Sequence, residues 1–122
     1  MKKILILALL LFLPANVYAK EWYEGGNLHK KTALDWQVAS YDNKLATCAD
    51  FISSLWQKKS FKPELQRKIT SLDEIKTLSQ ELVKSMDKAF AKDPDPEKNK
   101  RMFVNQNVSS TAVLLMVMMG WL

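Results

Sequence analysis

The sequence predicts an all-α fold, a small bundle of about four helices with a cleavable N-terminal signal peptide and a short extended arm. Residues 108–119 are strongly apolar and uncharged, which is typical of a helix packed on several sides, so we expect this helix at the centre of the bundle. Residues 41–58 and 72–91 place apolar side chains three and four positions apart, as the buried stripe of a helix does. The pattern calls for no β-sheet.

The first 19 residues have the organisation of a secretory signal peptide. Lys2 and Lys3 supply the positive start, residues 4–13 form an unbroken apolar run, and Val17 and Ala19 suit the third and first positions before a cleavage site. We therefore expect cleavage after Ala19 and a periplasmic or secreted protein. The alternative is an uncleaved N-terminal anchor, which the short apolar run disfavours.

Removal of the signal peptide leaves 103 of the 122 residues, enough for a single helical domain over residues 20–122. The formal charge falls from +5 to +3 because Lys2 and Lys3 are lost with the signal peptide. No basic block interleaved with aromatic residues is present, so nucleic acid is not expected as a partner. Cys48 is the only cysteine, which excludes an internal disulfide and favours a buried, packing role over an intermolecular disulfide or a reactive thiol.

The mature chain should begin with an extended arm, in which the aromatic pair Trp22 and Tyr23 precedes a Gly-Gly-Asn turn. A first short helix is expected over residues 32–39, with Thr32 as its cap. The helix over residues 41–58 follows. Its apolar stripe consists of Tyr41, Leu45, Cys48, Ile52, Leu55 and Trp56.

A connector and a long helix make up the middle of the chain. Pro63 can occupy the first turn of a short helix in the connector. Ser71 and Glu74 have the spacing of a capping box, in which Ser71 accepts from the Glu74 amide while the Glu74 side chain reaches back to Ser71. This signal predicts the start of the amphipathic helix over residues 72–91.

The C-terminal part combines a linker with the most apolar helix. Residues 92–101 contain two prolines and dense alternating charge, which predicts an exposed linker. The apolar helix should span residues 106–119, with Gly120 terminating it and Trp121 folding back onto the bundle. Residues 108–119 rise only about 18 Å, which is too short to span a bilayer, so no membrane span is expected after signal removal.

The residues that usually carry catalysis or bind metals form no recognisable pattern. His29 is the only histidine, and the common zinc spacings are missing. A pairing of Cys48 with His29 as nucleophile and base has no support from the flanking residues. The sequence therefore predicts no catalytic residue, no cofactor and no metal.

One short segment suggests a family resemblance. The run Thr47-Cys48-Ala49-Asp50-Phe51-Ile52, followed by Ser60-Phe61-Lys62-Pro63, resembles the Thr-Cys-x-Asp-Phe-Leu segment of the small periplasmic acid-stress chaperones of the HdeA type. That family's disulfide requires a second cysteine, which this chain does not have. The resemblance implies a protein of similar size, export and helical content.

These observations predict a small exported, non-enzymatic protein that binds another protein in the periplasm, such as an inhibitor, an immunity-type protein or an accessory subunit, as a monomer or homodimer. The expected partner contacts are the aromatic side chains Trp22, Tyr23 and Trp56. An acid- or stress-responsive chaperone is the alternative, and an enzyme is a third possibility. For the Met-rich end, core packing is favoured over an adaptable binding surface.

Overall fold

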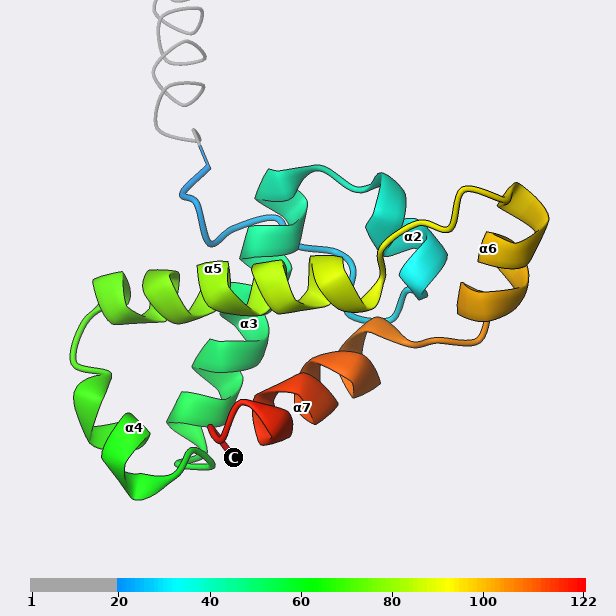
Figure 1. Ribbon diagram of the computed structural model, residues 1–122. Helices are drawn as coiled ribbons and strands as arrows, with labels where there is room; N and C mark the ends of the chain where they lie inside the picture. The colour runs from blue at the N-terminus through cyan, green and yellow to red at the C-terminus, as the bar shows by residue number, and fades with distance from the viewer. Residues whose placement is uncertain (1–19) are drawn as a thin grey trace, which may run out of the picture.

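The computed structural model describes residues 20–122, and the predicted signal peptide lies outside this range. The described residues form helices and no strand, so the all-α prediction is confirmed for this part of the chain (Figure 1). The six helices are α2 (Ala33–Val38), α3 (Tyr41–Gln57), α4 (Pro63–Lys68), α5 (Leu72–Ala89), α6 (Pro96–Phe103) and α7 (Val108–Met118).

The described residues contain one helix that the sequence pattern does not predict, α6. The expected segments coincide with α2, α3, α5 and α7, and the short helix expected at Pro63 is α4. Residues 92–101 are largely exposed, as predicted, but their second half is helical and not a linker, because α6 begins at Pro96. Asp95 is its N-cap and accepts from the Glu97 N–H at 3.1 Å, so an Asp-Pro pair that indicated a break is in fact a helix start.

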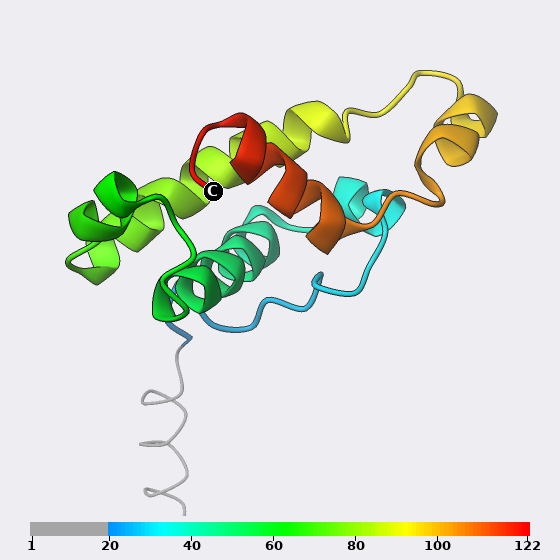
Figure 2. The ribbon, with the colours of Figure 1, turned by 90° about the horizontal axis from the view of Figure 1, so that it is seen from below.

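The hydrophobic core forms where α5 crosses α3 (Figures 1 and 2). Ile52 of α3 and Leu82 and Met86 of α5 have no exposed surface. Burial of each such side chain stabilises the fold by about 1.5–3 kcal/mol. Cys48 is equally buried, in agreement with the packing role predicted for it.

The apolar helix α7 lies against the α3–α5 pair and not at the centre of the bundle, so the predicted position is wrong (Figure 2). One side of α7 is buried through Val108, Ala112 and Met116. The opposite side remains exposed. Three of the six helices in the described residues are only six to eight residues long. The bundle therefore has too few side chains to cover α7 on all sides.

The N-terminus of α5 is capped by Ser71 and Glu74, and Glu74 reaches back to Ser71 as predicted, but Ser71 accepts from the Asp73 N–H and not from the Glu74 N–H. The Ser71 hydroxyl oxygen accepts from the Asp73 N–H at 3.3 Å. The Glu74 carboxylate also reaches one residue further back than expected and accepts from both the N–H and the hydroxyl of Thr70, at 3.1 and 2.7 Å. The Ser71 hydroxyl also donates to Glu74 at 2.8 Å. These bonds, with the Thr70 hydroxyl foremost, lower the pKa of Glu74.

The extended arm is attached to the helices through its backbone. Leu28 is buried, and its N–H donates to the Thr47 hydroxyl at 3.3 Å. Thr32 is the N-cap of α2 but makes no side-chain capping bond, in contrast to the prediction. Instead, Thr32 pairs with Asn107 in an isolated β-bridge, which joins the end of the arm to the start of α7.

The C-terminal end of α7 has the geometry predicted from Gly120. This glycine has φ +80°, a left-handed conformation. Its N–H donates to the Val117 carbonyl at 3.0 Å, and the Trp121 N–H donates to the Met116 carbonyl at 2.9 Å, which is the Schellman pattern. Trp121 then folds back and is buried. Among the described residues no helix has the length and apolar character that crossing a membrane requires.

Two glycines provide a matched test of this packing. A Cβ at Gly26 would lie 2.7 Å from the Ala46 carbonyl carbon and closer still to the Thr47 nitrogen, both in the backbone of α3. A Cβ at Gly120 would meet nothing within 4 Å, so only its backbone conformation is strained. We expect Gly26→Ala to lower the free energy of unfolding by about 3 kcal/mol or more, and Gly120→Ala by about 1–2 kcal/mol. Urea denaturation measures both, and equal losses would contradict the close approach of the arm to α3.

Candidate functional site

The polar groups considered for catalysis are separated in the structure. Cys48 is fully buried in α3, and burial, with a smaller contribution from the Asp87 charge, raises the pKa of its thiol. The thiol is therefore protonated and inaccessible. His29 is partly exposed, and its Nε2 lies 2.8 Å from an Asp50 carboxylate oxygen. Within residues 20–122, no group of three or more His, Cys, Asp or Glu side chains is arranged to hold a metal ion.

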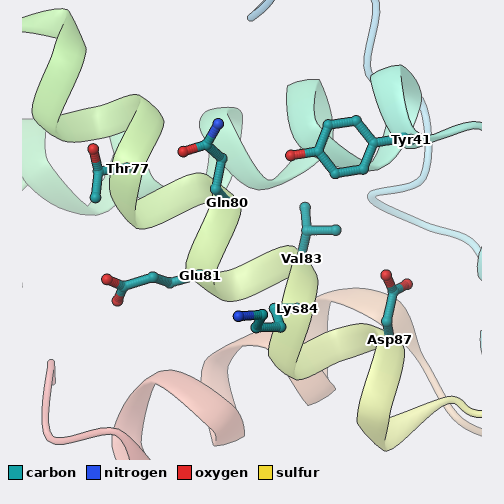
Figure 3. Close-up of a pocket in the computed structure, with 7 residues that line it drawn as sticks. All are labelled: Tyr41, Thr77, Gln80, Glu81, Val83, Lys84 and Asp87. Atoms are coloured by element: carbon teal, nitrogen blue, oxygen red, sulfur yellow. The ribbon is translucent and has the colours of Figure 1, made fainter.

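A shallow hollow of about 410 Å³ lies between the start of α3 and the exposed side of α5. In Figure 3, Tyr41 points toward Gln80, whereas Glu81 and Lys84 point away from it to the other side of α5. Acidic, basic and neutral side chains are thus mixed, and they do not converge on one point. We find no arrangement of nucleophile, base and orienting group in this hollow.

The three aromatic residues predicted as partner contacts lie in two separate places. Trp22 packs partly against the core, with Tyr23 edge-on at 5.4 Å and the Lys76 ammonium over its ring at 5.5 Å. It also lines a hollow with Asn43 near the start of α3. Trp56 lies in the last turn of α3 and is 37% exposed. The structure therefore does not unite these residues into one surface, and their role as contacts stays a prediction.

The largest group of exposed apolar side chains on a single helix belongs to α7. Val113, Leu114, Val117 and Met118 are 48%, 58%, 51% and 72% exposed. Their spacing of one, three and four residues places them on one side of the helix, opposite Ala112 and Met116. We call these four residues the outer face of α7.

The outer face of α7 is held in place by the body of the protein. Asn107 caps the helix by accepting from the Ser110 N–H at 3.1 Å. At the other end, Met119 packs against the core, and the Ser85 hydroxyl of α5 lies 3.4 Å from its sulfur. A helix fixed at both ends presents its side chains in a defined geometry, which lowers the entropic cost of binding.

Sequence reasoning missed this surface because α7 is apolar on all sides from Ala112 onward. A helix with alternating polar and apolar sides reveals its buried stripe through the sequence pattern, but a uniformly apolar helix has no such stripe. The Met-rich end is the one signal in the sequence, and there the sequence favours core packing over a binding surface. The structure separates its members, since Met116 is buried and Met118 is the most exposed side chain of the face.

Comparisons with models of protein families, with curated proteins and with solved structures find no match to this chain. The candidate function therefore depends on the geometry of the chain itself.

The exposed and buried sides of α7 should differ sharply in their effect on stability. We expect Met116→Ala to lower the free energy of unfolding by about 2–5 kcal/mol, because it leaves a cavity beneath the helix. Leu114→Ala should change it by no more than about 0.5 kcal/mol, because the side chain is largely in solvent already. Thermal and urea unfolding give both values. A large loss for Leu114→Ala would mean that the outer face is covered.

Proposed function

We propose that this chain is a small exported, non-enzymatic protein that binds another protein in the periplasm through the outer face of α7. Such a protein would act as an inhibitor, an immunity-type protein or an accessory subunit. The observation that carries this proposal is the exposure of four apolar side chains on a helix that is firmly attached to the body of the protein.

The composition of the face supports a protein ligand. Contiguous exposed apolar patches of more than a few hundred Å² are rare on monomeric soluble proteins and mark interaction surfaces. Interface cores are poor in charged residues and enriched in methionine, whose flexible side chain adapts to the shape of a partner. The face contains two valines, one leucine and one methionine, and α7 carries no charged side chain.

The remaining features agree with a binding role. The signal peptide expected from the sequence directs the chain to the periplasm or the medium. The buried thiol of Cys48 and the isolated His29–Asp50 pair offer no assembled reaction centre. The hollow in Figure 3 is open and lined by side chains of mixed charge, which suits a solvated surface better than a substrate site.

In-cell photo-cross-linking provides the test. A photoreactive phenylalanine derivative at Leu114 should cross-link one protein in stoichiometric amount when the chain is expressed at native level in its own periplasm. The same group at Val38, which is 73% exposed on α2, is the control and should give no such product. Further probes at Tyr23 and Trp56 test the predicted aromatic contacts. Absence of a specific product at Leu114 would refute the proposed function.

An acid-responsive chaperone is the second candidate, and the contacts of the carboxylates favour it. Asp87 accepts from the Trp36 indole N–H at 2.9 Å and from the Lys44 ammonium at 2.9 Å, which joins α2, α3 and α5. Because the pKa of Glu74 is lowered in the folded state, its ionised form stabilises the fold above about pH 4. That contribution is lost as the pH falls through the lowered value.

Acid titration separates the two candidates. A chaperone of this kind should lose tertiary packing between neutral pH and about pH 2 and should bind a hydrophobic dye, because opening of the bundle exposes its apolar side chains. Near-UV circular dichroism and dye fluorescence measure these changes. Glu74→Gln should lower the free energy of unfolding at neutral pH. Below about pH 4 the variant and the unmodified protein should have the same stability, because Glu74 is then protonated. A protein that stays closed and dye-free at about pH 2 would exclude the chaperone.

A further inference from the structure

The charges at the two ends of α7 define the chemistry of the partner. We infer that the partner segment that covers the outer face of α7 is apolar in its middle and acidic at both ends. This inference rests on the proposed function and specifies the kind of protein surface that α7 binds.

Three basic side chains surround the C-terminal end of α7. Lys62, Arg67 and Lys68 of the α4 region line a hollow of about 520 Å³ together with Gly120 and Trp121, the residues that end α7. The Lys62 N–H donates to the Trp121 carbonyl at 2.9 Å, so this basic group is tied to the end of the helix. Glu64 is the one acidic side chain in the lining, which leaves the hollow positively charged.

A second basic group lies before the N-terminal end of α7. Lys100 and Arg101 occupy the last turn of α6 and are exposed. Only residues 104–107 separate α6 from α7, and Figure 2 shows α6 beyond the start of α7, at the end opposite α4. From Met102 to Leu122 the chain has no charged residue, so the apolar face lies between two basic groups.

The sides of the outer face carry no comparable excess of charge. Contact between Ser85 and Met119 shows that α5 runs beside α7. Glu81, Lys84 and Lys88 are exposed on this part of α5 and together leave one positive charge, compared with two at the α4 hollow (Lys62, Arg67 and Lys68 against Glu64) and two on α6 (Lys98, Lys100 and Arg101 against Glu97). The larger net positive charge therefore lies at the two ends.

Within residues 20–122, these basic groups form no ion pair with an acidic side chain. The ion pairs in residues 20–122 involve His29, Lys44 and Lys98 and none of the side chains of Lys62, Arg67, Lys68, Lys100 and Arg101. Exposed cations near the ends of a helix that carries an apolar face favour a partner with the opposite charge, which speeds encounter and sets the orientation of the complex.

The same charges disfavour two other occupants. A second copy of this chain would bring basic groups together in either a parallel or an antiparallel pairing of α7, because both ends are positive. A membrane surface would also attract cations, but helices that insert into the lipid interface usually present Trp, Phe or Leu. The outer face of α7 has a single leucine and no aromatic residue.

The test combines charge reversal with the photo-cross-linker at Leu114. The first double variant, Arg67→Glu with Lys68→Glu, reverses the charge near the C-terminal end of α7. The second, Lys100→Glu with Arg101→Glu, reverses the charge on α6 before its N-terminal end. The matched control, Lys30→Glu with Lys92→Glu, makes the same change in net charge at exposed positions outside both basic groups. Each end variant should reduce the cross-linked product about tenfold or more, and the control should leave it unchanged. Circular dichroism confirms that all variants are folded.

Mass spectrometry of the cross-linked peptide gives the second result. We expect an apolar segment of the partner with Asp or Glu on both sides. A basic or neutral segment, a second copy of this chain, a lipid adduct, or end variants that cross-link as well as the control would overturn the inference.

The apolar variant Met118→Glu distinguishes failure of the inference from failure of the proposed function. If it removes the product while both charge reversals retain it, α7 binds a protein of another chemistry and only the inference fails. If no protein is cross-linked at Leu114 even without these changes, the proposed function fails as well.

Discussion

The contact between α3 and α5 supports every other element of the described chain. Ile52, Leu82 and Met86 are completely buried where these two longest helices cross. Such burial is the main favourable term in folding, and a chain of this size without a disulfide depends on it. The arm packs against α3 at Gly26, and α7 lies over the pair, so neither has a defined position without it.

Polar contacts hold the peripheral helices in place. The Gln37 amide of α2 donates to the Asn99 side chain at 3.0 Å and to the Phe90 carbonyl at 2.9 Å, and Asn99 donates back to Gln37 at 2.8 Å. Phe103 packs edge-on to Phe90 at a centroid distance of 6.2 Å. These contacts dock α6 on α2 and α5 and thereby determine where the basic side chains at its end are placed.

The candidate surface follows from the small number of long helices. An α3–α5 pair can cover one side of a third helix, and the short helices α4 and α6 lie beyond the ends of α7 and not over its outer face (Figure 2). The apolar residues of that face consequently remain in solvent. Their hydration is unfavourable in free energy unless another molecule covers them. The same arrangement places Arg67 near the C-terminal end of α7 and places α6, which carries Arg101, beyond its N-terminal end.

Sequence alone was sufficient for the helical class, the regions of the long helices and the left-handed end of α7, because these depend on local spacing and on the freedom of Gly120. Local reasoning failed at Pro96, where the same residue type either interrupts or begins a helix according to its cap. Only the tertiary structure shows that Glu74 forms hydrogen bonds with Thr70. It also shows that Met116 is buried while Met118 is exposed. An apolar helix has no pattern to indicate which side is covered, and that choice depends on how α3 and α5 pack against it.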